Sequence, residues 1–215
     1  MIKKRLFSAI LLPVILSGCD DAPATNALRK IQKIVEHKTT PFITVDSVWR
    51  GDVSHCFYEK RHGDCLISTI QNSGSPKAVA AAMYVSAKED YGYVSGYTRI
   101  HNIAIATVTY PFREKNTQED ILVPSEGAPV DMQDALQDLE ANSQWQRFLQ
   151  KQPHAFPVGP GFLLDKSVNY HGQQLFYAYP VKVCEGCETI GILTMSYNFD
   201  RSGDFTGNEV VGVVN

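Results

Sequence analysis

The sequence predicts an α+β fold in which a central antiparallel β-sheet is flanked by helices and followed by a C-terminal β-meander. Three observations lead to this prediction. Helical patterns prevail in the first half of the chain, an alternating β pattern follows at residues 96–113, and three strand-like runs with short connections fill residues 162–199. Helices and strands are thus grouped along the chain, which is typical of α+β domains.

The first 19 residues have the order of a secretory leader. A basic cluster, Lys3-Lys4-Arg5, precedes the apolar residues 6–16, and Leu16-Ser17-Gly18-Cys19 closes the segment. At about a dozen residues the apolar run is too short for a membrane-spanning helix. The last four residues resemble a bacterial lipobox, whose cysteine becomes the lipidated first residue of the mature protein. The alternatives are an ordinary signal peptide with an incidental cysteine and an uncleaved anchor.

The resemblance implies three segments: a signal peptide at residues 1–18, a lipidated tether at 19–26 and a single periplasmic domain at 27–215. Several acyl chains on one N-terminus hold a protein stably at a bilayer, so the membrane is the first expected partner. Asp20 directly follows Cys19 and resembles the inner-membrane retention signal of enterobacterial lipoproteins. We therefore expect a lipid-anchored protein of the bacterial cell envelope that faces the periplasm from the inner membrane.

The charge balance argues against nucleic-acid binding. The chain has 20 basic and 23 acidic residues, and removal of the three basic leader residues leaves 17 against 23, a formal net charge of −6. Binding to nucleic acids or to anionic lipids needs a strongly basic face. The sequence predicts no such partner.

Four cysteines remain after Cys19 is assigned to the lipid. An even number of cysteines in an oxidising compartment indicates disulfides. We expect two local bonds: Cys56–Cys65, around the tip of a hairpin or short loop, and Cys184–Cys187, in a turn between two strand-like runs. Crossed pairing between the two segments is the alternative, because it would close much longer loops.

Two chemical interpretations compete for the same cysteines. The Cys184-Glu185-Gly186-Cys187 motif has the spacing of a redox-active dithiol, but a strand-like run follows it where a helix would be required to acidify the thiol. The other interpretation is a zinc or copper site built from the four cysteines with His55 and His62 nearby.

Elements of the first half follow from local patterns. Residues 27–37 predict a helix, because apolar residues recur every three positions, and residues 40–49 and 65–71 predict strands. Ser75-Pro76 supplies a cap and a first-turn proline for a helix that ends near Asp90.

A long central strand is predicted at residues 96–113, because apolar and β-branched side chains occupy both of its alternating sets. Residues 121–124 then form a return strand. Asp131 caps the next helix, and Ser143 with Gln146 resembles a capping box for a second one. The loop at residues 152–161 leads to the meander, whose predicted strands are residues 162–169, 174–183 and 189–199.

Part of this meander suggests a family. Tyr177-Ala178-Tyr179-Pro180-Val181 and Ile190-Gly191-Ile192-Leu193 follow a helix and a loop, and residues 131–200 in this order resemble the later half of extracytoplasmic Cache and PAS-type sensor modules. The resemblance implies a ligand-binding accessory lipoprotein with an aromatic pocket. The same side chains are alternatively core residues. The candidate pocket residues are Tyr93, Tyr97, Trp145, Tyr177 and Tyr179.

No motif of a hydrolase is present: the chain has no G-x-S-x-G, S-x-x-K or H-E-x-x-H. We therefore expect a non-enzymatic protein, without cofactor or metal, that binds an envelope protein partner in a transport, secretion or signalling complex. The second hypothesis is a small-ligand sensor with a Cache/PAS-like sheet. The third is a thiol or metal-dependent enzyme that uses Cys184 and Cys187.

Overall fold

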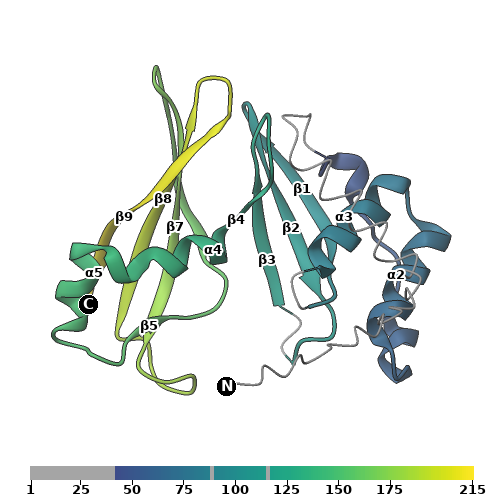
Figure 1. Cartoon of the computed structure of the whole chain (residues 1–215), viewed down its shortest axis with the longest axis horizontal. Coiled ribbons are helices and arrows are strands. Elements are labelled where there is room, and N and C mark those ends of the chain that lie inside the picture. The colour runs from purple at the N-terminus through teal and green to yellow at the C-terminus, as the bar shows by residue number, and fades with distance from the viewer. Residues whose placement is uncertain (1–41, 88–89, 115–116) are drawn as a thin grey trace, which may run out of the picture.

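The computed structural model describes residues 42–87, 90–114 and 117–215. Two antiparallel sheets, of four and five strands, and several helices make up this part of the chain, which confirms the α+β class (Figure 1). The strands are divided between two sheets, where the sequence predicted one. The leader, the tether and the helix expected at residues 27–37 lie outside the described residues.

Helices form the start of the described chain. The order is a 3₁₀ helix η1 (Val45–Ser47), a 3₁₀ helix η2 (Ser54–Tyr58), α2 (His62–Ser73) and α3 (Pro76–Ser86). At the start of α3 the Ser75 hydroxyl accepts a hydrogen bond of 3.0 Å from the amide of Ala78, which confirms the predicted cap. The helix ends at Ser86, before the predicted Asp90.

Two strands predicted in this region are wrong. Residues 65–71 belong to α2, because Leu66 and Ile70 lie four residues apart and are both fully buried on one helical face. The segment between Cys56 and Cys65, predicted as the tip of a hairpin or a short loop, comprises the end of η2, a short connection at residues 59–61 and the first turn of α2, and no hairpin. Residues 40–49 form no strand where they are described, since Ser47 accepts a hydrogen bond from the Thr44 amide and closes η1.

The first sheet has the strand order β1 (Tyr93–Ile100), β2 (Ile103–Tyr110), β3 (Thr117–Val123) and β4 (Val130–Asp131). The single long strand predicted at residues 96–113 is therefore a hairpin, and its turn contains His101 at a φ of 51°. The expectation that both faces of this segment are covered holds for β2, which lies between β1 and β3 and is buried along most of its length.

The crossover and the second sheet follow. Asp131 accepts a hydrogen bond from the Gln133 amide at the start of α4 (Met132–Gln137). The 3₁₀ helix η3 (Asp138–Ala141) leads to α5 (Ser143–Leu149), which is capped by Asn142 and not by the predicted Ser143. The second sheet contains β5 (Phe156–Pro157), β6 (Phe162–Asn169), β7 (Gly172–Lys182), β8 (Gly191–Asp200) and β9 (Phe205–Val214), and β6 to β8 form the predicted meander.

The first sheet separates two cores. Its outer face packs against α3, and α2 lies beyond α3, as Figure 1 shows. Its inner face contributes Ile103, Ile105 and Leu122 to an inter-sheet core with the second sheet and the α4–α5 segment. Hydrogen bonds also join loops of the two sheets, from Ser125 to Asp204 at 2.9 Å and from Asn102 to Arg201 at 2.7 Å. None of the described helices is both long and apolar enough to cross a bilayer.

Candidate functional site: a pocket at the start of α2

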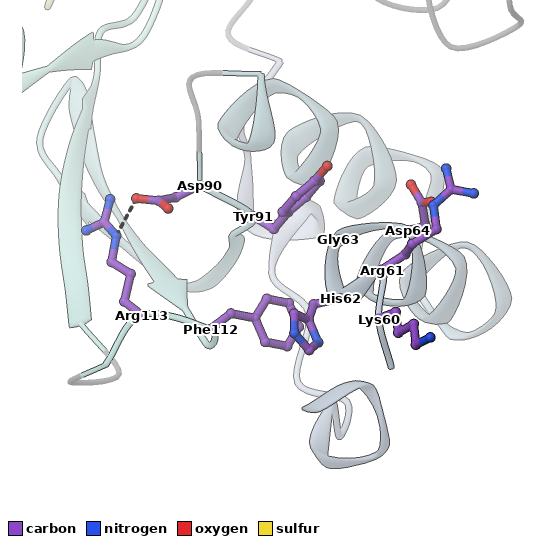
Figure 2. Close-up of a pocket in the computed structure, with 9 residues that line it drawn as sticks. All are labelled: Lys60, Arg61, His62, Gly63, Asp64, Asp90, Tyr91, Phe112 and Arg113. Atoms are coloured by element: carbon purple, nitrogen blue, oxygen red, sulfur yellow. Dashed lines mark hydrogen bonds and ion pairs between the residues drawn. The ribbon is translucent and has the colours of Figure 1, made fainter. Parts of the chain in front are cut away.

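A pocket of about 360 Å³ lies beside the start of α2 (Figure 2). Three segments that are separate in sequence line it: the turn into α2, the residues that precede β1 and the residues that follow β2. We call it the α2 pocket. Its lining residues are Lys60, Arg61, His62, Gly63, Asp64, Asp90, Tyr91, Phe112 and Arg113.

A disulfide fixes the first of these segments. Cys56 in η2 is bonded to Cys65 in α2, with a Cα–Cα distance of 5.6 Å. The ring nitrogen Nδ1 of His62 lies 2.8 Å from the carbonyl oxygen of Cys56 and donates a hydrogen bond to it. The residues between the two cysteines are therefore held as a short loop that carries Lys60 and Arg61 to the pocket.

Gly63 allows the second segment to approach. A Cβ atom at this position would lie 2.0 Å from Cζ of Tyr91, so any other residue would displace the ring. Gly63 itself is buried, while Tyr91 keeps 44% of its surface exposed. The tyrosine ring thus lies directly on the helix backbone and forms one wall of the pocket (Figure 2).

Aromatic rings form a second wall. The rings of His62 and Phe112 are stacked, with centroids 5.2 Å apart and an interplanar angle of 29° (Figure 2). The rings of Phe57 in η2 and Phe112 are packed edge to face, with centroids 5.4 Å apart. Such ring pairs contribute stabilisation beyond the area they bury, which favours a preformed wall.

The charges of the lining are unevenly paired. Arg61 Nε lies 2.6 Å from Asp64, and Arg113 Nε lies 2.7 Å from Asp90. Arg113 also binds Glu119. Lys60 has no ion-pair partner among the described residues, so the lining has one basic side chain in excess.

Arg113 is the most constrained of these groups. Partial burial disfavours its charged form, but hydrogen bonds to Glu119 and Asp90 outweigh that effect and raise the pKa of the guanidinium. Its Cζ lies 3.7 Å from the centroid of the Tyr110 ring. Burial raises the pKa of Tyr110 to about 12. The guanidinium is therefore a fixed cation at one edge of the pocket.

This arrangement is suited to binding. Basic side chains beside aromatic walls can hold an anionic group together with a flat or apolar portion of the same ligand. The lining contains no serine, threonine or cysteine that would serve as a nucleophile.

Both predicted disulfides are present. Cys56–Cys65 adjoins the α2 pocket, and Cys184–Cys187 closes the turn between β7 and β8 with a Cα–Cα distance of 5.1 Å. The crossed pairing is therefore excluded. Cys19, the predicted lipidation site, lies outside the described residues.

The five aromatic residues predicted to line a pocket do not share one cavity. Trp145, Tyr177 and Tyr179 are buried together in the inter-sheet core. Tyr93 packs edge-on against Trp49, and Tyr97 packs against the core on the outer face of the first sheet. None of the five lines the α2 pocket.

Sequence reasoning missed the α2 pocket because its three segments come together only through the fold. The available local signal was the basic run Lys60-Arg61-His62 followed directly by Gly63, inside a disulfide loop. Assigning that loop to a hairpin tip concealed the helix start on which the site depends.

No family model, no curated protein and no solved structure matches the chain.

Proposed function

We propose that this chain is a lipid-anchored, non-enzymatic protein of the bacterial cell envelope that acts as a binding or accessory component of an envelope complex. The observation that carries the proposal is the pair of local disulfides, Cys56–Cys65 and Cys184–Cys187, downstream of a leader that resembles a lipobox. Disulfides form and persist in oxidising compartments, as expected for a body that faces the periplasm. Asp20 favours the inner membrane as the site of anchoring.

The α2 pocket is the proposed binding site. An acidic side chain of an envelope protein partner enters beside Lys60 and Arg61, and its neighbouring apolar atoms contact Tyr91 and the stacked rings of His62 and Phe112. Lys60 contributes most to this recognition, because it has no acidic partner of its own among the described residues.

A small-ligand sensor is the second candidate. The volume of about 360 Å³ supports it, since small-molecule sites commonly span about 300–1,000 Å³. The bound molecule would carry the same acidic group and would remain with the purified protein.

Photo-crosslinking from position 91 tests the proposal. The full-length chain with a benzophenone amino acid in place of Tyr91 is expressed in its membrane, irradiated and compared with the same chain carrying Lys60→Glu. We expect one discrete protein adduct, whose yield falls about tenfold with Lys60→Glu, because one charged hydrogen bond contributes about 1.5 kcal/mol.

Lys151→Glu is the matched control, since Lys151 is exposed and lies outside the α2 pocket. An adduct whose yield is the same in all three chains would refute docking at the pocket. The small-ligand candidate would be favoured by two results together. The first is that no protein adduct forms, and the second is that native mass spectrometry finds a bound small molecule on the wild-type chain that is absent from the Lys60→Glu chain.

A further inference from the structure

A group of metal-ligand atoms surrounds the first disulfide. A ring nitrogen of His55 and the two Sγ atoms of Cys56 and Cys65 all lie within 4.8 Å of one another. Nε2 of His55 lies 3.5 Å from Sγ of Cys56. These three residues form the only such group in the described part of the chain, and we call them the His–Cys–Cys cluster.

We propose that reduction of the Cys56–Cys65 disulfide converts the His–Cys–Cys cluster into a zinc site. Two thiolates and one imidazole are ligands that Zn²⁺ prefers, and three protein ligands leave the fourth position to water or to a ligand. The site is distinct from the proposed partner binding at the α2 pocket and does not depend on it.

The reaction balances with an external dithiol as the reductant. The dithiol gives two electrons and two protons to the Cys56–Cys65 bond and becomes a disulfide itself, which leaves two thiols on the chain. Zn²⁺ then displaces the two thiol protons. The product, one dication with two thiolates and a neutral imidazole, carries no net charge.

The backbone keeps the two sulfurs together without the covalent bond. The Cys56 amide donates to the Val53 carbonyl at 2.9 Å, and the Cys65 amide donates to the Arg61 carbonyl at 3.1 Å. His62 further ties the Cys56 carbonyl to the start of α2. Because each cysteine is fixed by its own helix, the sulfurs remain close enough to share an ion after reduction.

Thr69 orients the histidine. Its hydroxyl donates to the Cys65 carbonyl at 2.8 Å, so the 3.0 Å contact with His55 requires that Nε2 of His55 carries the proton and donates it to the Thr69 oxygen. Zinc binding needs the lone pair of that nitrogen. The proton therefore moves to Nδ1 of the ring, which the exposure of His55 allows through solvent.

The second disulfide lacks this environment. No histidine or carboxylate of the described chain forms a metal-ligand group with Cys184 and Cys187. The structure therefore places metal chemistry at the first cysteine pair, with His55 and without His62, whose Nδ1 is engaged with the Cys56 carbonyl.

The test uses the full-length chain in detergent with Cys184→Ser and Cys187→Ser, so that Cys56 and Cys65 are the one cysteine pair left beside Cys19. After reduction with a phosphine, Co²⁺ is titrated anaerobically and then displaced by Zn²⁺. We expect one Co²⁺ per chain, an intense thiolate-to-cobalt absorption band, and no binding before reduction. His55→Ala should weaken Zn²⁺ binding by about 100-fold and alter the cobalt spectrum, because loss of even an outer partner of a metal ligand costs about 10–100-fold.

His154→Ala is the matched control, since His154 is exposed and lies outside the cluster. Equal Zn²⁺ affinity of the His55→Ala chain, or no stoichiometric Co²⁺ binding by a reduced chain that keeps its near-UV circular dichroism, would overturn the proposal.

A second measurement needs no cysteine variant. In the reduced wild-type chain, stoichiometric Zn²⁺ should slow the alkylation of Cys56 and Cys65 relative to the same reduced chain without metal, as read by peptide mapping, and should leave the reaction of Cys184 and Cys187 unchanged. Alkylation of Cys56 and Cys65 that is the same with and without Zn²⁺ would refute the zinc site even where the double serine variant does not fold.

Discussion

Asp120 shows how one residue couples the two sheets. Its carboxylate accepts hydrogen bonds from Thr107 at 3.1 Å and from Tyr177 of the second sheet at 3.2 Å. Burial raises the pKa of this carboxyl, although both hydrogen bonds act in the opposite direction. The sequence suggested a pocket role for Tyr177, because local patterns do not reveal that two residues 57 positions apart meet.

Asp120 predicts a pH dependence of stability. Because its pKa is higher in the folded than in the unfolded chain, the folded state binds more protons above the ordinary value of 3.8. Its contribution to the free energy of unfolding is therefore most favourable at low pH and is lost as the pH rises through the folded pKa. Asp120→Asn keeps an oxygen acceptor and should flatten the profile at pH values above 3.8, measured by urea unfolding.

Glu126→Gln is the control for this measurement, because Glu126 is exposed. A profile of the Asp120→Asn chain parallel to that of the wild type would show that Asp120 carries no such linkage.

At the scale of elements, the sequence predicted those whose signals are local. The Ser75 cap, the meander of β6 to β8 and the Cys184–Cys187 turn are all present as predicted. α2 was missed because the alternation within residues 65–71 suggested a strand, whereas burial of one helical face against α3 decides its structure. The seven residues 65–71 do not by themselves show that α3 packs against this face.

The two disulfides should differ in their effect on stability. Cys56–Cys65 has a sequence separation of nine and closes a loop of ten residues when both cysteines are counted, whereas Cys184–Cys187 has a separation of three and closes a loop of four. In the chain-entropy model, removal of the first costs about 2.7 kcal/mol and removal of the second about 1.9 kcal/mol. Cys56 is also fully buried. The gap in the free energy of unfolding between the two double variants should therefore exceed the difference between these two costs, with the Cys56→Ser/Cys65→Ser chain the less stable. Urea unfolding of the two double variants measures both costs, and equal losses would contradict the prediction.

At the scale of the whole molecule, 22 residues separate Cys19, the predicted lipidation site, from Phe42, the first described residue. The described chain begins at Phe42, whose ring packs edge-on against the ring of Tyr84 with centroids 4.8 Å apart. Extended chain between Cys19 and this point spans at most about 80 Å. The α+β class could be predicted from the order of elements, but the pocket could not, because its walls come from segments brought together by α2, α3 and the β1–β2 hairpin.

The anchor itself gives the last prediction. If Cys19 is the lipidated residue, cells fed an alkyne-tagged palmitate should label the wild-type chain, and Cys19→Ser should abolish that label, because no acyl group can be attached without the thiol. The chain with Cys184→Ser and Cys187→Ser is the matched control and should keep its label, since those cysteines pair with each other. In-gel fluorescence after coupling a dye to the alkyne measures all three. Unchanged labelling of the Cys19→Ser chain would refute the lipid anchor, whereas loss of label in the control as well would point to failed export, because both variants then stop before the acylation step.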